Sequence, residues 1–340
     1  MNKTVLFVTT LNDLQTGVYI RDAFKKLGWK VILFDYNIEL EKISNINPEY
    51  KKEKMFYSLM KIVKTEKIDL LLSLKSIYVW PDIVEEAKKR GIYTACWMFD
   101  TTLNGKKIIE DEGFIKLIKV YDVFYSFCNN IEELRANGVN AKQLKEGYDE
   151  DYNSKQQLSN VKTEEIGADV VFIGSFSHLF RERIKYLSKI SEEGFDFKIY
   201  GITLPEDKFT KDEVELAKKH HQNIPVANKH HSYVCQSSKI CLGLDGWPEI
   251  DESFSARLYR TLACGGFYLM RHTKGVEKYF KPGIHLDVFE DEEDMIKKIK
   301  YYLSHTEERE RIAMAGMEEV KKHTFANRIK EEFGRGDKYD

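Results

Sequence analysis

The sequence predicts an α/β protein built from two doubly wound domains in tandem. Three observations support this fold class: the chain has 340 residues, 42% of them are apolar, and short apolar runs alternate with helical patterns along both halves. A chain of this length exceeds what one hydrophobic core usually serves, so two domains are expected. Nearly continuous apolar strands separated by helices indicate parallel sheets that are covered on both faces.

Residues 1–150 are predicted to form the first domain. Its strands are expected in five apolar runs, namely Thr4–Thr9, Val31–Asp35, Asp69–Leu74, Tyr93–Phe99 and Val123–Phe127. Its helices are expected between them, at Gln15–Leu27, Lys52–Lys64, Ile83–Arg90 and Lys106–Val120. The polar stretch Asp149–Glu165 lacks apolar periodicity. It is therefore expected to be the linker, with the domain boundary between residues 149 and 168.

Residues 168–325 are predicted to form the second domain, and residues 326–340 a charged C-terminal tail. The strands of this domain are expected at Asp169–Gly174, Phe197–Tyr200, Ile240–Leu244, Phe267–Met270 and His285–Phe289. Its main helices are expected at Phe180–Glu192, Ser253–Ala263, Glu292–Leu303 and Thr306–Lys322. The alternation repeats that of the first half, which is why the same doubly wound architecture is expected twice.

Charge and cysteine usage narrow the class of protein. The 53 basic and 55 acidic residues balance to a net charge of −2, which gives no general support for nucleic-acid binding. The five cysteines are scattered and form no CxxC pair, as expected for buried thiols in a reducing cytoplasm. The apolar run Thr4–Thr9 is too short for a signal peptide or a membrane span. A cytoplasmic protein is expected.

The segment between Ile240 and Met270 is the strongest candidate site. Its strand ends at Asp245, and ligands of open α/β sheets bind beyond the carboxyl ends of strands. The following helix opens near Ser253 and Ser255, where free backbone N–H groups and the helix dipole suit a phosphate.

Two arginines follow in that helix. Arg257 lies in the first turns and offers a charged fork to a diphosphate, and Arg260 lies one turn further on a neighbouring face. A plain structural interpretation stays open at this point. Phe254, Leu258 and Leu262 form an apolar stripe, and the glycine pair at 265–266 is a helix stop.

The run from Ser255 to Gly266 resembles the C-terminal signature of the CgeB/YkvP-like spore-protein glycosyltransferases, which resemble the group-1 glycosyltransferases of GT-B fold. The resemblance covers about residues 168–325 well and residues 1–150 more weakly. Further segments carry it, namely Val171–Ser175, Gly275–Phe280, Pro282–Gly283, Asp291–Glu293 and Glu307–Gly316.

The resemblance implies two Rossmann-like domains facing across a cleft, and sugar transfer from a nucleotide-sugar donor to an acceptor hydroxyl. The donor diphosphate is then expected at Gly174, Ser175 and a nearby arginine, either Arg181 or Arg183, of which Arg183 fits the spacing better. The helix with Arg257 and the Gly265–Gly266 turn would face the nucleotide. Three more residues would lie near the donor sugar or ribose, namely Lys274, Gly275 and Glu277.

The chain departs from the group-1 pattern at one position. Many of these enzymes carry two glutamates eight positions apart, and the second binds the ribose; here Glu252 takes the first place and Arg260 the second. An arginine cannot accept hydrogen bonds from ribose hydroxyls. This difference keeps two alternatives open: a nucleotide- or sugar-binding protein without transferase activity, and a GT-B nucleotide-sugar epimerase.

The first domain is expected to bind the acceptor through loops after its first and fourth strands, at Thr10–Gly17 and Trp97–Thr102. Asp100 stands at a strand's carboxyl end and could act as general base, with Asp13 as a second candidate. Capping of a helix or turn is the alternative role for Asp100. The acceptor stays open between a cell-surface polymer, a spore-coat component, a small metabolite and modified DNA bases.

No metal site and no cofactor beyond the nucleotide sugar are expected. The pairs His220–His221 and His230–His231 lack carboxylates or cysteines at a motif spacing, and nearby lysines would repel a cation. They are expected to be surface or hinge histidines. The resemblance implies that basic residues and a helix dipole neutralise the leaving diphosphate in place of a metal.

Overall fold

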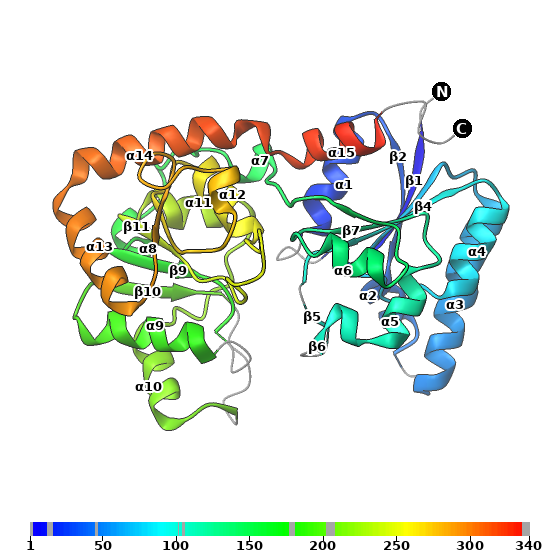
Figure 1. Cartoon of the computed structure of the whole chain (residues 1–340), viewed down its shortest axis with the longest axis horizontal. Helices are drawn as coiled ribbons and strands as arrows, with labels where there is room; N and C mark the ends of the chain where they lie inside the picture. The colour runs from blue at the N-terminus through cyan, green and yellow to red at the C-terminus, as the bar shows by residue number, and fades with distance from the viewer. Residues whose placement is uncertain are drawn as a thin grey trace. The chain divides into compact units, whose positions relative to one another are not determined.

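The computed structural model describes residues 3–11, 16–44, 47–100, 102–103, 106–176, 181–201 and 208–334. The chain divides into two compact units, shown in Figure 1: residues 1–145 together with 325–340, and residues 146–324. Each unit is an α/β domain with a parallel sheet, which confirms the predicted fold class. In the part of the chain described, no helix has the length and apolar character that a membrane span needs.

The first unit contains a six-stranded parallel sheet in the order β2-β1-β3-β4-β7-β8. Its strands are β1 (Thr4–Thr9), β2 (Lys30–Asp35), β3 (Leu70–Leu74), β4 (Tyr93–Met98), β7 (Val123–Ser126) and β8 (Ala141–Gln143). A short antiparallel pair, β5 (Thr102–Leu103) and β6 (Lys106–Lys107), stands apart from it. The helices are α1 (Gly17–Lys26), α2 (Tyr36–Lys42), α3 (Pro48–Thr65), α4 (Pro81–Lys89), η1 (Ile108–Glu110), α5 (Glu112–Ile118), α6 (Ile131–Ala136) and α15 (Phe325–Phe333).

Both faces of this sheet are buried because the strands are apolar at successive positions. Leu6 and Val8 of β1 belong to a core shared with α3, α4, α5 and α6. Phe7, which points to the opposite face, lies 6.4 Å from Phe24 of α1, measured between ring centroids. The near-continuous apolar runs that predicted the strands therefore reflect a sheet with helices on both sides.

The C-terminal helix α15 completes the first unit. It lies beside α1, as the red and blue ribbons in Figure 1 show. Phe325 stacks on Tyr19 at 6.3 Å, and Phe333 lies 6.0 Å from Phe24. Residues 326–340 were expected to be a charged tail, and this expectation is wrong for residues 326–333. The reason is an apolar stripe, Phe325, Ile329 and Phe333, at helical spacing on an otherwise charged segment.

The second unit contains a five-stranded parallel sheet in the order β10-β9-β11-β12-β13. Its strands are β9 (Val170–Ile173), β10 (Phe197–Tyr200), β11 (Ile240–Gly243), β12 (Tyr268–Arg271) and β13 (Asp287–Phe289). Its helices are α7 (Glu150–Asn153), α8 (Thr163–Ile166), α9 (Arg181–Glu192), α10 (Lys211–His220), α11 (Asn228–Gln236), α12 (Ala256–Ala263), η4 (Val276–Lys278), α13 (Glu292–Ser304), α14 (Thr306–Glu319) and η5 (Val320–Lys322).

Two cores cover the two faces of this second sheet. On one face Val170 and Phe172 of β9 pack with α9, α10, α13 and α14. On the other face Val171 and Ile173 pack with α11 and α12. The amphipathic stripe predicted for the helix after Asp245 is present, since Leu258 and Leu262 of α12 are fully buried in the second core.

Several boundaries differ from those predicted. The chain leaves the first unit after Lys145, and the expected linker Asp149–Glu165 belongs to the second unit and holds α7 and most of α8. The helix expected at Lys106–Val120 is divided, because Asp111 caps a new helix start by accepting from the Phe114 amide at 2.9 Å. Helices α2, α6, α10 and α11 and strand β8 were not predicted, since their segments are short or polar.

Each sheet has one point where the order of strands reverses. In the first unit this point lies between β1 and β3, and in the second between β9 and β11. Crossover helices leave these points on opposite faces, so the loops at the carboxyl ends of the two strands diverge and leave room for a ligand. Ligands of this fold class bind at such positions.

The packing of α15 leads to a stability prediction. Phe325 is fully buried against Tyr19 and Trp97, so Phe325→Ala should destabilise the first unit by about 3–5 kcal/mol. Urea unfolding followed by tryptophan fluorescence measures this, because three of the four tryptophans (29, 80 and 97) lie in the first unit. Met314→Ala, at a side chain that is 61% exposed, is the control and should leave the curve unchanged. An unshifted transition for the Phe325 variant would contradict the role given to α15.

Candidate functional site

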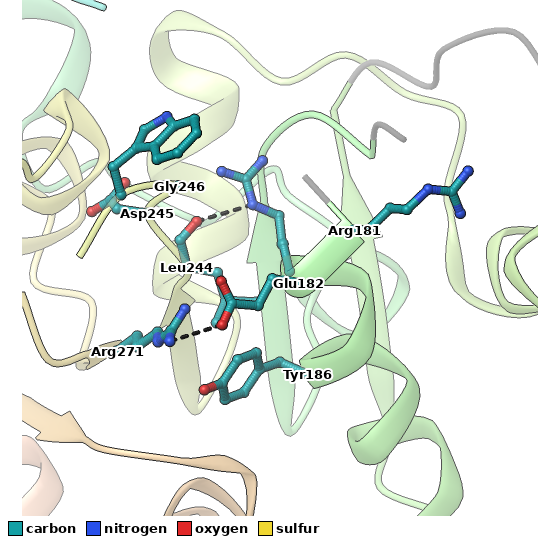
Figure 2. A pocket seen from close by; sticks show the side chains of 9 residues that line it. Arg181, Glu182, Tyr186, Leu244, Asp245, Gly246 and Arg271 are labelled. Carbon is teal, nitrogen blue, oxygen red and sulfur yellow. Dashed lines mark hydrogen bonds and ion pairs between the residues drawn. The ribbon is translucent and has the colours of Figure 1, made fainter. Parts of the chain in front are cut away.

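A pocket lies between the start of α9, which follows β9, and the carboxyl ends of β11 and β12 (Figure 2). Its volume is about 160 Å³, below the 300–1,000 Å³ of a pocket that holds a whole ligand. The pocket therefore suits one part of a larger ligand. Its lining contains three arginines and two carboxylates: Arg181, Glu182, Arg183, Tyr186, Leu244, Asp245, Gly246, Trp247 and Arg271.

Arg183, on α9, is the buried cation of this pocket. Its Nε donates to the Leu244 carbonyl at 3.0 Å and its Nη1 to the Ser175 carbonyl at 2.9 Å. The guanidinium thus bridges the loops that follow β9 and β11. The resemblance favoured Arg183 over Arg181; both line the pocket, and the Arg183 side chain is directed at both loops.

Arg257, on α12, reaches the same edge of the sheet from the opposite face. Its Nε donates to the Ile173 carbonyl at 2.5 Å, and its Nη1 lies 3.4 Å from Asp245 Oδ1. That ion pair is long, since charge-assisted bonds between nitrogen and oxygen are usually about 2.7–2.9 Å. Arg257 lies behind the pocket lining rather than in it, with a side chain that is 14% exposed.

The two guanidinium groups share one aromatic ring. The Cζ atoms of Arg183 and Arg257 lie 5.3 Å and 5.2 Å from the centre of the Phe172 ring, within the range of cation–π attraction. Burial and the neighbouring Arg257 charge lower the pKa of Arg183 to about 9. Two cations held this close in a partly dry environment favour an anion beside them.

The N-terminus of α12 differs from the prediction. Its first amides were expected to be free for a phosphate, but carboxylates of the chain already accept from them. The Ser255 amide donates to Asp245 Oδ2 at 3.4 Å, and the Ala256 amide donates to Glu146 Oε2 at 2.7 Å. The Ser255 hydroxyl also donates to Asp245, at 2.7 Å. The sequence analysis named Asp245 only as the end of the strand, and it missed Glu146, which is 110 positions away from its partner.

The loop after β9, where the resemblance implies diphosphate binding, begins at Gly174 and Ser175, which are not among the residues that line the pocket. Gly174 passes so close to its neighbours that a Cβ there would lie 2.7 Å from Phe172 Cζ and 2.8 Å from Arg257 Nη2. Ser175 contributes its carbonyl to Arg183. Residues 177–180, which continue this loop, lie outside the described residues.

Acidic, basic and aromatic side chains form the rim of the pocket. Glu182 pairs with Arg271 at 2.9 Å, as Figure 2 shows, and the Arg271 guanidinium lies 5.2 Å from the Tyr186 ring centre. Arg181 lines the pocket as well, but its Nη1 is held by Glu213 at 2.6 Å. Sequence reasoning missed Glu182, Tyr186 and Arg271; their only signal was position next to the predicted loops.

The glycine pair and Arg260 are not brought to the pocket. Gly265 and Gly266 follow α12 at its other end, about 15 Å along the helix from Ser255. A Cβ on Gly266 would lie 3.2 Å from both Cys235 Cβ and Cys241 Sγ. The pair therefore ends the helix and packs against α11 and β11, and the expectation that it faces the nucleotide is not supported.

The loop around Lys274 packs on the segment that leads to α12. The Lys274 amide donates to the Pro248 carbonyl at 3.1 Å, and the Glu252 amide donates to the Lys274 carbonyl at 2.6 Å. Gly275 has φ +84°, and a Cβ there would lie 2.5 Å from Asp251 Oδ1. Glu277 is half-exposed and pairs with His272 at 2.6 Å, away from the pocket lining.

Glu252, the first glutamate of the expected pair, is a structural anchor in this conformation. Its carboxylate lies 2.6 Å from Lys278 Nζ and accepts from the Tyr279 hydroxyl at 2.7 Å. Its side chain is buried, and its backbone has φ +59°, a region that non-glycine residues rarely adopt. The surrounding contacts must hold this residue in place, which fixes the loop between Asp245 and α12.

The first unit places Asp100 at the carboxyl end of β4, as predicted. Its carboxylate lies 2.6 Å from Lys75 Nζ, and both side chains are partly exposed. Lys75 opens a segment after β3 in which Lys75, Ser76 and Tyr78 all have φ between +52° and +60°. Such strain next to the β1/β3 reversal point is typical of functional loops. Asp13 lies outside the described residues.

Three of the four paired histidines are buried rather than at the surface, which corrects that expectation. His220 contacts the Ser191 hydroxyl at 2.8 Å and the Phe197 carbonyl at 3.0 Å. His221 accepts from the Asn223 amide at 2.9 Å, and His231 is packed beside Cys235. Tertiary hydrogen bonds of this kind cannot be read from a sequence.

Comparisons with known proteins agree with this geometry. Residues 181–333 match the family described as glycosyl transferase-like. No curated protein matches the chain. The matched segment begins at Arg181 and includes all residues that line the pocket, as well as α12.

Solved structures show the GT-B fold over nearly the whole chain. Sucrose-phosphate synthase from Thermosynechococcus elongatus superposes with a TM-score of 0.68 at 11% identity, covering 97% of this chain and 98% of that one. Anabaena HepE in complex with UDP and glucose gives 0.68 at 10% identity, with 98% of each chain covered. A protein described as a UDP-N-acetylglucosamine 2-epimerase from Listeria monocytogenes gives 0.55 at 13% identity, covering 97% and 95%.

The close approach at Gly174 leads to the next prediction. Gly174→Ala forces the Phe172 ring and Arg257 apart, and should destabilise the second unit by roughly 1–3 kcal/mol. Urea unfolding followed by circular dichroism measures the change. Gly113→Ala is the control, because a Cβ there meets only Asp111 Oδ1, at 3.4 Å, and alanine favours helix α5. Equal stability of the Gly174 variant and the parent protein would show that this contact imposes no constraint.

Proposed function

We propose that the chain is a glycosyltransferase that moves a sugar from a nucleotide-sugar donor to an acceptor hydroxyl, with the donor bound by the second unit. The observation that carries the proposal is the pair of guanidinium groups stacked on Phe172 at the β9/β11 reversal point. The family match over residues 181–333 supports the reaction class. HepE, which shares the fold, was solved with UDP and glucose, and this supports a nucleotide-bound sugar as the donor.

The finer assignment follows from the sequence. The run from Ser255 to Gly266 supports a place in the CgeB-like branch of the group-1 glycosyltransferases. The scattered, buried cysteines support a cytoplasmic protein, because all five thiols are free. No cofactor is needed beyond the nucleotide sugar as co-substrate.

The leaving diphosphate is the group that we assign to the arginines. Arg183 lines the pocket, and Arg257 holds Asp245 only at 3.4 Å, so a phosphate oxygen can replace that carboxylate as its partner. Charge-assisted bonds from two guanidiniums stabilise the negative charge that develops on the diphosphate as the glycosidic bond breaks. This chemistry requires no metal ion at the pocket. Ser175 and Gly174 provide the loop against which the diphosphate lies.

Recognition of the donor's hydroxyl groups needs a hydrogen-bond acceptor, and the side chain of Arg260 cannot supply one. Glu182 is the carboxylate of the pocket rim that is most exposed, at 60%, and its partner Arg271 fixes its direction. We assign the ribose or sugar hydroxyls of the donor to Glu182. The replacement of the usual glutamate by Arg260 is then no obstacle to donor binding.

The acceptor belongs to the first unit in this proposal. Asp100 is the carboxylate that would accept the proton of the acceptor hydroxyl as the new bond forms, and Lys75 positions it. The acceptor remains one of the classes named above: a polymer, a small molecule or a modified nucleic acid. A non-catalytic binding protein is the alternative that Arg260 suggests, and an epimerase is the alternative suggested by the Listeria structure of the same fold.

A donor screen tests the function. Thermal shift with uridine, guanosine, thymidine and adenosine diphosphate sugars identifies the donor, and a hydrolysis assay without acceptor follows. Release of free monosaccharide that persists in EDTA supports the proposal. An isomerised nucleotide sugar would identify an epimerase, and binding without any turnover would identify a binding protein. Complete loss of turnover in EDTA, restored by manganese, would contradict the metal-independent mechanism.

The pKa of Arg183 leads to a prediction about pH. In the free protein this pKa is about 9, and a bound diphosphate favours the charged form and raises it. Below pH 9 Arg183 is charged in both the free and the ligand-bound protein, so the affinity for the nucleoside diphosphate should be constant there. Above pH 9 binding must take up a proton, so the affinity should fall by about tenfold per pH unit. Calorimetric titration between pH 7 and 10 measures this affinity. The Arg183→Met variant should bind the nucleoside diphosphate weakly, and its affinity should show no change of slope near pH 9.

Arg257 offers a direct test of the diphosphate assignment. Arg257→Ala should weaken nucleoside diphosphate binding by roughly ten- to a hundredfold, the equivalent of about 1.5–3 kcal/mol. Arg257→Lys should recover part of the affinity, since it keeps the charge and loses the fork. Arg311→Ala, at an exposed arginine of α14, is the control. If a folded Arg257 variant keeps its affinity for the nucleoside diphosphate and only unfolds at a lower temperature, the role of Arg257 is structural, through its contacts with Asp245 and the Ile173 carbonyl.

Asp100 separates catalysis from donor binding. Asp100→Asn removes the proton acceptor, and should lower transfer at least ~100-fold while nucleotide affinity stays unchanged. Initial rates and calorimetry on the same preparation measure the two quantities. Asp169→Asn is a matched control, because Asp169 is paired with Lys239 at 2.7 Å on the surface of the second unit. Full turnover by the Asp100→Asn variant would show that Asp100 is not the proton acceptor, and that it only forms the ion pair with Lys75.

A further inference from the structure

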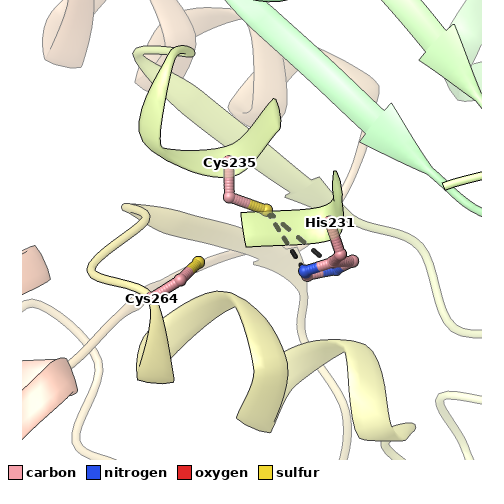
Figure 3. A group of neighbouring side chains, drawn as sticks. All are labelled: His231, Cys235 and Cys264. Atoms are coloured by element: carbon pink, nitrogen blue, oxygen red, sulfur yellow. Dashed lines mark hydrogen bonds between the residues drawn. The ribbon is translucent and has the colours of Figure 1, made fainter. Parts of the chain in front are cut away.

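A second cluster of chemically reactive side chains lies in the second unit, on the sheet face opposite α9. His231 and Cys235 stand four residues apart on α11, so they share one helix face, and Cys264 follows the last turn of α12 (Figure 3). All three side chains are buried; Cys235 and Cys264 are fully so. None of the three lines the pocket described above.

The spacing of these side chains is that of metal ligands. One imidazole nitrogen and the two sulfur atoms all lie within 4.8 Å of one another. Cys235 Sγ is 3.7 Å from His231 Nδ1 and 4.0 Å from Nε2. Around a tetrahedral zinc ion with bonds of about 2.3 Å to sulfur and 2.0–2.1 Å to nitrogen, neighbouring ligand atoms are about 3.6–3.8 Å apart. Small side-chain rotations therefore bring the trio to zinc geometry.

A third cysteine lies next to this cluster. Cys241 of β11 borders the cluster, with its Sγ 3.7 Å from the Cys235 carbonyl oxygen. Three of the five cysteines of the chain, Cys235, Cys241 and Cys264, thus belong to the second unit, while Cys96 and Cys128 lie in the first unit. Two thiols and an imidazole leave one tetrahedral position, and the Cys241 thiol can close it. A fully ligated and buried ion of this kind has no open position, so its role is structural.

The charge around the cluster bears on this ligand set. Metal binding requires a neutral imidazole and deprotonated thiols. A divalent ion with three thiolates and one imidazole carries a net charge of −1. The Arg260 charge that acts on His231 balances it.

We propose that His231, Cys235 and Cys264 bind one structural zinc-class divalent cation, with Cys241 as the fourth ligand. Binding forms three metal–sulfur bonds and one metal–nitrogen bond, and it releases the three thiol protons to solvent. The thiols are not oxidised. Soft thiolate and imidazole donors in a tetrahedral arrangement select zinc over magnesium or calcium. The ion would tie α11 to β11 and to the end of α12. It would be independent of the sugar transfer.

Metal content of the intact protein tests the proposal without any activity assay. The full chain, purified without chelator and dialysed, should contain about one zinc per chain by elemental analysis. Protein stripped with a strong chelator under reducing conditions should bind cobalt(II) with the visible bands of tetrahedral thiolate coordination. Its melting temperature should rise when zinc is restored.

Variants assign the ligands. Cys264→Ser and His231→Gln should lower the zinc content and remove the cobalt bands, whereas Cys128→Ser, at a buried cysteine of the first unit, should keep both. The parent protein decides the matter even where a variant fails to fold. Parent protein without zinc, without cobalt bands after reconstitution, or with a Cys235–Cys264 disulfide by mass spectrometry would overturn the proposal. None of these outcomes depends on whether sugar is transferred.

Discussion

The candidate site depends on how the second unit terminates its two central strands. Carbonyl groups at the carboxyl ends of β9 and β11 lose their strand partners where the chain diverges, and unpaired buried carbonyls are costly. Arg183 and Arg257 donate to three of them, those of Leu244, Ser175 and Ile173. The same two guanidiniums stack on Phe172. A structural need of the parallel sheet thus concentrates positive charge where ligands of this fold bind.

This arrangement changes which group can neutralise an anion. The helix dipole of α12 is already balanced by Asp245 and Glu146, which accept from its first amides. An anionic ligand must then rely on side-chain cations, and it competes with Asp245 for Arg257. Burial and the nearby Arg257 charge make the positive charge of Arg183 unfavourable. An anion bound there is therefore stabilised more than it would be at an exposed arginine.

The sequence predicted the fold wherever local pattern and final structure agree. The central strands were found because their apolar runs are buried on both faces. Helix α15 was missed although its apolar stripe has helical spacing, because the residue on which it packs, Tyr19, lies about 300 positions earlier in the chain. In the site, Arg183 and the Gly174 loop were expected from the resemblance. Asp245 and Glu146 as partners of α12 were not, because long-range hydrogen bonds leave no periodic signal.

Helix α12 shows how closely binding and stability are connected in this unit. Its first turn carries Arg257, and its end leads to Cys264 in the buried cluster with His231. Arg260 lies between them, and its charge acts on His231. This charge disfavours a protonated His231, so it does not by itself account for an arginine at position 260. The eight-residue helix is fixed at both ends by side chains from other elements, so the position of Arg257 is set by the packing of the whole face.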